Sequence, residues 1–260
     1  MPVESVQTNV HGSSPQGYAE SATNGAAHKA PTQVVAHQFP SLESGDRLSR
    51  AEFERRYLAR PDIKKAELIE GVVYVSSPVR IEQHSEPHSH LVGWLLMYRA
   101  ATPGLRMADN GTLRLDVDNE PQPDICLWID ERYGGQTRIA PDDYLEGAPE
   151  LIVEVAGSSA AYDLHNKLNV YRRNGIQEYL VLLPNEQRII WHVWHAGEYL
   201  SLAPDEQGVL RSQVFPGLWF DAARFWRDDI AGLLALLQEG INSPEHKLFV
   251  EQLASRRKVE

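Results

Sequence analysis

The chain has 260 residues, enough for one large domain or two small ones, and either could bury a hydrophobic core. Its 25 lysines and arginines against 36 aspartates and glutamates give a net charge of −11, so DNA binding would need a local basic patch or a metal ion. The single cysteine, Cys126, excludes an internal disulfide framework, and no apolar run approaches the roughly 20 residues that span a bilayer, which predicts a soluble cytoplasmic protein without membrane contact.

The amino-acid composition of the chain changes near residue 44. Residues 1–43 are rich in Ser, Ala, Gly, Thr, Asn and His and lack apolar periodicity, which predicts a disordered tail. Ser49 and Glu52 form a capping-box pattern and predict the start of a short helix. Two apolar runs flank the pair Glu70-Gly71 and predict a β-hairpin.

Two longer helices and a series of strands are predicted after the hairpin. Apolar residues at helical spacing predict one helix from about Pro87 to Ala101 and another from Tyr162 to Asn174. Strands are predicted at 105–108, 112–116, 124–129, 150–156, 178–183, 188–194 and 199–202. A polar loop is expected at 131–147, and residues 227–260 are expected to form a helical extension outside the core. This order predicts an α/β layered fold with a mixed sheet.

Glu154 is an unusual residue for its place in the chain. It lies inside the apolar run 151–156, which indicates a buried strand. An ionised carboxylate buried without a partner costs several kcal/mol or more, so we expect a cation beside it. That cation could be a side chain or a metal ion.

Two further residues are expected to lie close to Glu154. Asp124 opens the predicted strand that follows Pro123, and Lys167 lies in the helix after Glu154, on its apolar face. Two carboxylates from adjacent strands can hold Mg²⁺, which polarises a phosphoryl oxygen and lowers the pKa of a bound water. A lysine can position that water or stabilise developing charge. The set therefore suits phosphodiester hydrolysis.

Several short motifs carry a resemblance to a known family. In chain order they are Glu67-Leu68-Ile69-Glu70-Gly71, the segment from His88 to Leu95, Pro123-Asp124, Glu154-Val155, Asp163 with Lys167 and Tyr171, Gly175-Ile176, Glu178-Tyr179, and Phe215-Pro216-Gly217-Leu218. Together they resemble the putative restriction endonuclease family common in cyanobacteria, within the PD-(D/E)xK nuclease superfamily. The resemblance covers roughly residues 44–226 and implies a restriction-endonuclease-like fold, with a central mixed β-sheet flanked by helices.

The resemblance also implies roles for single residues. Asp124 and Glu154 would hold Mg²⁺ or Mn²⁺, and Lys167 would be the catalytic lysine. The superfamily's lysine normally stands two residues after the glutamate, where this chain has Ala156. Many relatives have Ser-Pro-Ser where this chain has Gly157-Ser158-Ser159, a change beside the expected site.

Four residues are predicted to have auxiliary roles. Glu70 could lie near the metal, although a glutamate before glycine is usually a turn residue. His88 matches a histidine of this helix in relatives and is expected to approach the phosphate. Arg172 and Arg173 could contact the DNA backbone, but two arginines on a helix are usually a solvated face.

Simpler interpretations stand beside these. Glu154 and Lys167 could form a buried structural ion pair, and Asp163 could instead hold Lys167 on the surface as an i,i+4 pair. His84 and His90 are expected to belong to a solvated helix start.

The leading hypothesis is a metal-dependent endonuclease that hydrolyses DNA phosphodiester bonds. The alternative is a catalytically inactive protein of the nuclease fold that binds nucleic acid or a partner protein. A homodimer is also considered, because enzymes that cut both DNA strands often pair their sites.

Overall fold

The computed structural model of the protein describes residues 40–76, 78–157 and 160–258. Contacts divide the chain into Met1–Gln38 and Phe39–Glu260, and every described residue belongs to the second unit. The tail predicted at 1–43 therefore lies outside the described residues as far as residue 39. Leu42 is buried in a cluster with Phe53, so packing begins before residue 44.

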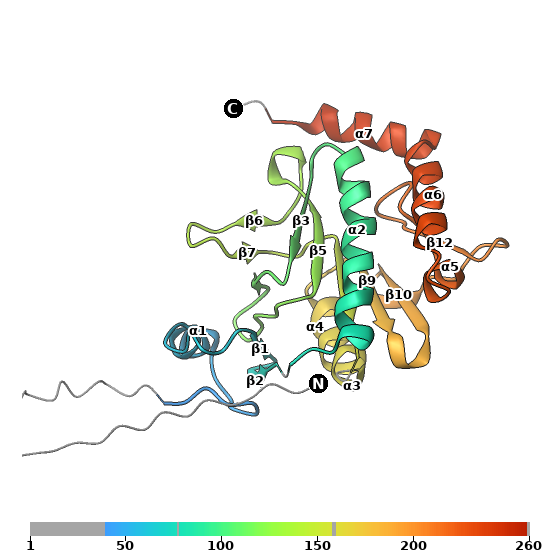
Figure 1. Ribbon diagram of the computed structural model, residues 1–260. Coiled ribbons are helices and arrows are strands. Elements are labelled where there is room, and N and C mark those ends of the chain that lie inside the picture. Colours follow the sequence, from blue (N-terminus) through green and yellow to red (C-terminus); the bar gives the residue numbers. More distant parts are fainter. Residues whose placement is uncertain (1–39, 77, 158–159, 259–260) are drawn as a thin grey trace, which may run out of the picture. The chain divides into compact units, whose positions relative to one another are not determined.

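A mixed sheet of six strands forms the centre of this unit (Figure 1). Its strands, in order across the sheet, are β11 (Glu198–Ser201), β10 (Arg188–His195), β9 (Glu178–Leu183), β8 (Leu151–Val155), β5 (Ile125–Ile129) and β3 (Leu105–Asp109). The pair β8–β9 is parallel and the other neighbours are antiparallel. A parallel pair needs a crossover connection, and the predicted second helix lies in that crossover.

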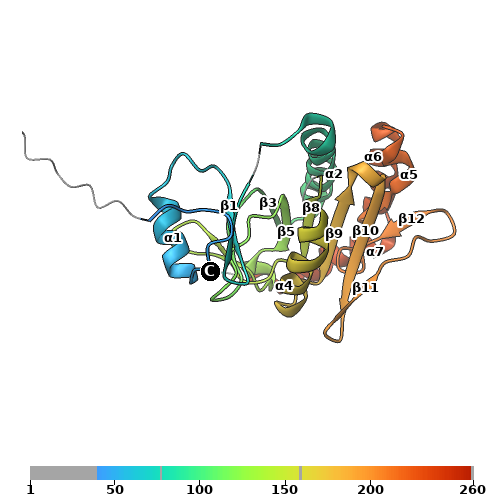
Figure 2. The ribbon, with the colours of Figure 1, turned by 90° about the horizontal axis from the view of Figure 1, so that it is seen from below.

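Helices cover both faces of the sheet, as Figure 2 shows for α2 and α4. Helix α2 (Glu86–Ala101) buries the residues that its spacing predicted, which are Leu91, Trp94, Leu95 and Tyr98. Helix α4 (Leu168–Arg173) packs on the opposite face through Val170 and Tyr171. The predicted fold class, an α/β fold with a central mixed sheet flanked by helices, is confirmed.

The crossover helix is divided into three parts. It begins as α3 (Ala160–Tyr162), continues as a π-helical turn η3 (Asp163–Lys167) and ends as α4. Gly175 follows in the left-handed region at φ +75°, a conformation that glycine adopts without a steric penalty. A second π-helical turn, η1 (Ile81–Ser85), precedes α2. Ser158 and Ser159, in the loop that departs from many relatives, lie outside the described residues.

The N-terminal elements form a small core of their own. Helix α1 (Arg50–Leu58) starts at the predicted cap, where Ser49 accepts a hydrogen bond from the Glu52 amide. Strands β1 (Ala66–Ile69) and β2 (Val72–Val75) form the predicted hairpin. Glu70 and Gly71 both have positive φ, as a two-residue hairpin turn of type I′ requires.

Several short elements were not predicted. They are η2 (Glu131–Tyr133), β6 (Arg138–Ile139), β7 (Leu145–Glu146), η4 (Pro184–Glu186), β12 (Val209–Arg211) and β13 (Trp219–Asp221). The expected loop at 131–147 thus contains two strands, of which β7 also pairs with β4 (Leu113–Arg114). Segments of two or three residues carry too little periodicity to be predicted from sequence.

The C-terminal helices belong to the main core. These are α5 (Ala222–Trp226), α6 (Ile230–Ile241) and α7 (Pro244–Arg256). The expectation that 227–260 lies outside the core is wrong, because Leu233, Leu237 and Leu253 are buried in the same cluster as α2. Helical periodicity identifies an apolar face but not what that face packs against. None of the described helices is long and apolar enough to cross a membrane.

A buried carboxyl at the start of the central strand generates a prediction about pH and stability. Glu150 accepts a hydrogen bond from the Ile129 amide (2.9 Å), and burial raises its pKa from 4.5 to about 7. Between pH 4.5 and about 7 this carboxyl loses its proton in the unfolded chain but keeps it in the folded protein. The free energy of unfolding therefore falls as pH rises through this interval.

Glu150→Gln keeps the acceptor oxygen and removes the ionisation. We expect it to increase the free energy of unfolding at pH 8 by about 3 kcal/mol more than at pH 4.5. Urea denaturation at both pH values measures this difference. An equal effect at the two pH values would contradict the prediction.

Candidate functional site

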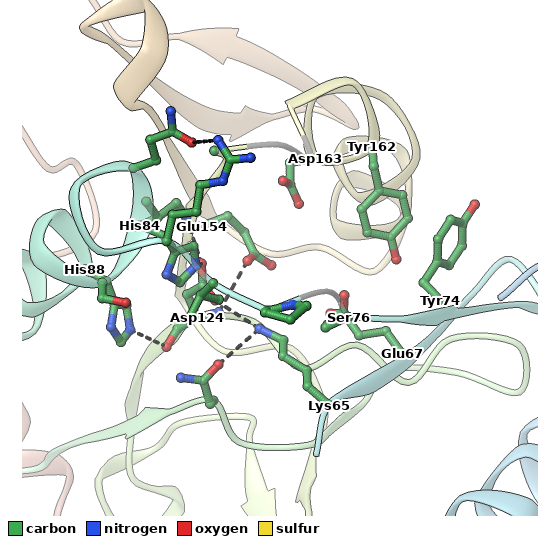
Figure 3. Close-up of a pocket in the computed structure, with 18 of the residues that line it drawn as sticks. Lys65, Glu67, Tyr74, Ser76, His84, His88, Asp124, Glu154, Tyr162 and Asp163 are labelled. Atoms are coloured by element: carbon green, nitrogen blue, oxygen red, sulfur yellow. Dashed lines mark hydrogen bonds and ion pairs between the residues drawn. The ribbon is translucent and has the colours of Figure 1, made fainter. Parts of the chain in front are cut away.

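A cavity of about 1020 Å³ lies where the β1–β2 hairpin, the central sheet and the two π-helical turns meet (Figure 3). Its ionisable lining residues are Lys65, Glu67, Tyr74, Arg80, His84, His88, Asp109, Asp124, Glu154, Tyr162, Asp163 and Lys167. The three residues predicted to be catalytic are thus brought to one cavity.

The pairing of β5 with β8 positions the two predicted metal carboxylates. Ile125 pairs with Val153, and continuing this antiparallel register by one residue sets Asp124 opposite Glu154. The Asp124 amide donates to Glu154 Oε2 (3.3 Å), and the Val155 amide donates to Asp124 Oδ2 (2.9 Å). Strand alternation directs both side chains to the face that α4 covers.

The Lys167 ammonium is buried among three carboxylates. Its Nζ is 2.8 Å from Glu154 Oε1, 2.9 Å from Glu67 Oε1 and 3.6 Å from Asp163 Oδ1. The predicted proximity of Lys167 and Glu154 is therefore confirmed. The alternative that Asp163 holds Lys167 on the surface is wrong, because both side chains are buried.

Both π-helical turns border the cavity. A π turn contains one more residue than an α turn and redirects the side chains that follow it. Turn η3 carries Asp163 and Lys167, and turn η1 carries His84, all of which line the cavity. Both of these π-helical turns therefore lie at the site.

Glu154 is held by several donors and remains difficult to ionise. Its Oε1 accepts hydrogen bonds from Lys167 Nζ (2.8 Å) and from the Tyr171 hydroxyl (3.0 Å). Burial raises the pKa of Glu154 to about 8, against the opposing effect of the Lys167 ammonium. Burial alone would lower the pKa of Lys167, but the surrounding carboxylates raise it well above its usual value, so the ammonium stays charged.

Asp124 has a different set of partners. Lys65 Nζ lies 2.9 Å from its Oδ1, and His84 Nε2 lies 3.1 Å from its Oδ2. Burial works to raise the pKa of Asp124, but the His84 hydrogen bond, the Lys65 charge and the Val155 amide hold it well below its usual range. Asp124 is therefore the ionised carboxylate of the pair.

The buried part of the site contains more acidic than basic groups. Among the described residues, its four carboxylates are Glu67, Asp124, Glu154 and Asp163, and its one buried ammonium is Lys167, with the half-buried Lys65 beside Asp124. A protonated His84 would add one positive charge. The remaining negative charge can be relieved by a proton, as the raised pKa of Glu154 indicates, or by a bound cation.

Glu67 is a site residue that the sequence reasoning missed. Its Oε1 accepts a hydrogen bond from the Gln122 amide (2.8 Å) and contacts Lys167. Glu70, the predicted auxiliary residue, lies at the hairpin turn outside the cavity lining and pairs with Arg173 (2.8 Å) on the surface. A carboxylate inside an apolar strand was the signal at Glu154, and the same signal exists at Glu67.

The histidines also differ from expectation. His84 was expected in a solvated helix start, yet it lines the cavity and contacts Asp124. His88 lines the cavity as well, with Nε2 3.0 Å from Asp109 Oδ1 and 3.3 Å from the Asp124 carbonyl oxygen. The predicted approach of His88 to a phosphate stays a prediction. His90 does not line the cavity.

The two arginines proposed for the DNA backbone lie away from the cavity. Arg172 donates to the Gly197 carbonyl oxygen (2.8 Å) and lies 3.4 Å from a Glu198 carboxylate oxygen. Arg173 is the partner of Glu70. Neither residue lines the cavity, so the structure does not bring them together with the carboxylates.

The donor set can be compared with the requirements of Mg²⁺. Within the described ranges, no group of three or more His, Cys, Asp or Glu side chains is arranged to hold a metal ion. Mg²⁺, however, commonly takes one or two carboxylates and completes its coordination with waters and substrate phosphates. Asp124 and Glu154 provide two such carboxylates, and the excess negative charge favours a cation. The two carboxylates therefore match the type and number of protein ligands that Mg²⁺ commonly takes, while Lys65 and His84 contact the two oxygens of Asp124.

Comparisons with known proteins identify similar chains. A family model described as "Uma2: Putative restriction endonuclease" matches residues 50–223. The crystal structure of a protein described as a putative nuclease belonging to DUF820, from Anabaena variabilis ATCC 29413, is similar with a TM-score of 0.49 at 16% identity. That match covers 70% of this chain and 97% of the other. No curated protein matches the sequence.

The enclosed ammonium generates a prediction about stability. Lys167→Met leaves Glu67, Glu154 and Asp163 buried without their shared cation, so we expect it to lower the free energy of unfolding by about 3–5 kcal/mol at pH 8. The loss should be smaller at pH 5, where Glu154, whose pKa burial raises to about 8, is protonated and needs no cation. Urea denaturation at both pH values measures it.

Two further variants serve as controls for this prediction. Glu154→Gln in the Lys167→Met background should recover part of the loss, because it removes a buried carboxyl whose ionisation no longer has the Lys167 cation beside it. Lys64→Met removes a surface lysine that bonds only to the Pro61 carbonyl oxygen, and it should change stability little. A similar loss in Lys64→Met and Lys167→Met would contradict the argument.

Proposed function

Because the chain belongs to the Uma2 putative restriction endonuclease family, we propose that it is a metal-dependent endonuclease that hydrolyses DNA phosphodiester bonds. The observation that carries the proposal is the pair Asp124 and Glu154, set opposite each other on adjacent strands in one cavity with Lys167. Two carboxylates that can share a cation, beside an ammonium, suit a reaction in which negative charge develops on a phosphate.

Asp124 and Glu154 are the residues proposed to hold Mg²⁺ or Mn²⁺. When bound, the metal would polarise a phosphoryl oxygen and lower the pKa of a water. Both carboxylates are fixed before binding, because each takes part in a hydrogen bond between β5 and β8. Fixed ligands do not have to be ordered at the time of binding, which favours affinity.

Lys167 and Tyr171 are proposed to fix the orientation of Glu154. Both donate to Glu154 Oε1, which leaves Oε2 with the weaker Asp124 amide contact. The positive charge of Lys167 also favours negative charge at the buried end of the cavity. In this role Lys167 assists hydrolysis by orienting Glu154 and does not contact the substrate.

DNA as the substrate must be bound by local rather than overall charge. The net charge of −11 gives no long-range attraction for a polyanion. Cationic side chains at the cavity can still contact a phosphate, and Arg80 is exposed there beside His84 and His88. We propose that the cavity, and not the surface at Arg172 and Arg173, receives the phosphate to be cleaved.

One feature favours the alternative of a catalytically inactive protein on this fold. Lys65 and Lys167 already provide positive partners for Asp124 and Glu154, and His84 contacts Asp124 as well, so the site is neutralised in part without a metal. Such a protein would keep the fold and bind nucleic acid or another protein without hydrolysis. Metal binding by the two carboxylates separates the two functions.

Loss of either metal carboxylate should abolish cleavage. We expect Asp124→Asn and Glu154→Gln to lower the rate of Mg²⁺-dependent plasmid cleavage on the order of a hundredfold or more, since each removes an anionic ligand. Glu70→Gln is the matched control, because Glu70 pairs with Arg173 outside the cavity, and it should cleave like wild type. Equal cleavage by all four proteins would refute the assignment.

Metal binding can be measured without any substrate. Isothermal titration with Mn²⁺ should show binding by the wild type and a large loss of affinity in Asp124→Asn and in Glu154→Gln. Melting curves of the same samples test whether each variant is folded. No Mn²⁺ binding by a folded wild type, together with no cleavage, would favour the inactive alternative.

A further inference from the structure

The cavity contains two ammoniums that differ in their access to solvent. The Lys167 side chain is 3% exposed, whereas the Lys65 side chain is 23% exposed. Figure 3 shows Lys65 reaching from the hairpin toward Asp124. A phosphate that enters the cavity can therefore meet Lys65 more readily than Lys167.

The donors of Lys167 are already used within the protein. An ammonium has three N–H groups, and Glu154, Glu67 and Asp163 lie 2.8, 2.9 and 3.6 Å from its nitrogen. The Tyr162 ring lies close to the same ammonium, with its centroid 5.3 Å from the nitrogen. Contact between Lys167 and a substrate would expose three buried carboxylates to one another, which is unfavourable.

Lys65 has fewer partners, and one of them is neutral. Its Nζ lies 2.9 Å from Asp124 Oδ1 and 3.0 Å from Asn110 Oδ1. Loss of the contact with Asp124 would leave the bond to Asn110, so the ammonium would stay at the cavity. A lysine ammonium is a compact charge on a flexible stem and can move between neighbouring anions.

We propose that Lys65 is the residue that binds the substrate phosphate, and that it is released for this task when Asp124 coordinates a divalent cation. This inference rests on the proposed function, since it requires a cation at Asp124. In the metal-free protein Lys65 neutralises Asp124. With the cation present Lys65 is repelled from it and is free to pair with the negative charge of a phosphate.

The proposal assigns different tasks to the two lysines. Lys167 is a positioning residue that holds Glu154, whereas Lys65 contacts the substrate. The neighbouring Lys64 provides a matched control, because it has the same charge one residue away, is exposed and does not line the cavity. If Lys65 contributed only general positive charge, Lys65→Met and Lys64→Met would weaken DNA binding equally.

The test compares DNA affinity with and without a cation. Binding of a fluorescently labelled DNA duplex is measured by anisotropy in Ca²⁺, an oxygen-seeking cation, and in EDTA, for wild type, Lys65→Met, Lys65→Arg and Lys64→Met. We expect Lys65→Met to weaken binding about tenfold in Ca²⁺ and less than about twofold in EDTA, because the charged hydrogen bond forms only with the cation present. Lys65→Arg should recover part of the affinity, and Lys64→Met should match wild type.

The possible results are distinguishable. Equal weakening of Lys65→Met in Ca²⁺ and EDTA, or equal effects in Lys65→Met and Lys64→Met, would overturn the role of Lys65. Mn²⁺ titration and plasmid cleavage by the wild type test the proposed function independently of the role of Lys65. A wild type that binds no divalent cation overturns both proposals, whereas a cleaving wild type with an unaffected Lys65→Met overturns only this one. Melting curves identify a misfolded variant, and Lys65→Arg then provides the comparison in both conditions.

Discussion

The Lys167 ammonium, enclosed by three carboxylates, is the interaction on which the site and part of the fold depend. Its partners come from three places: Glu67 from the N-terminal hairpin, Glu154 from the central strand, and Asp163 from the same π-helical turn. Without a cation at their centre, these buried carboxylates would repel one another. One charge thus joins the hairpin, the sheet and the crossover helix at the cavity.

The backbone around this interaction departs from regular helix where the site requires it. Turn η3 carries both Asp163 and Lys167, four residues apart in sequence, to the cavity. Turn η1 carries His84 to Asp124 from the other side. Strand pairing fixes the remaining geometry, since Asp124 and Glu154 bond to each other's strands. Asp124 and Glu154 are therefore held by paired strands, whereas Lys167 and His84 come from the π-helical turns.

The two carboxylates differ in chemistry although they are neighbours. Asp124 has partners that keep it ionised, whereas burial and further acidic groups make Glu154 difficult to ionise. Environments that separate the pKa values of adjacent groups are typical of functional sites, although ion-pair networks also produce them. The excess of acidic groups is the basis of the proposed cation site, and the different burial of Lys65 and Lys167 is the basis of the different roles proposed for them.

Local periodicity, turn residues and the cost of a buried charge are enough to predict the strands of the central sheet, the hairpin, the two main helices and the anomaly at Glu154. They also predict Lys167 beside Glu154, since its helix directly follows that strand. No pattern in the sequence predicts that Glu67 rather than Glu70 joins the site, that Lys65 and His84 hold Asp124, or that the C-terminal helices complete the core. Their partners are distant in sequence, and strand register and helix packing, which no local pattern encodes, bring them together.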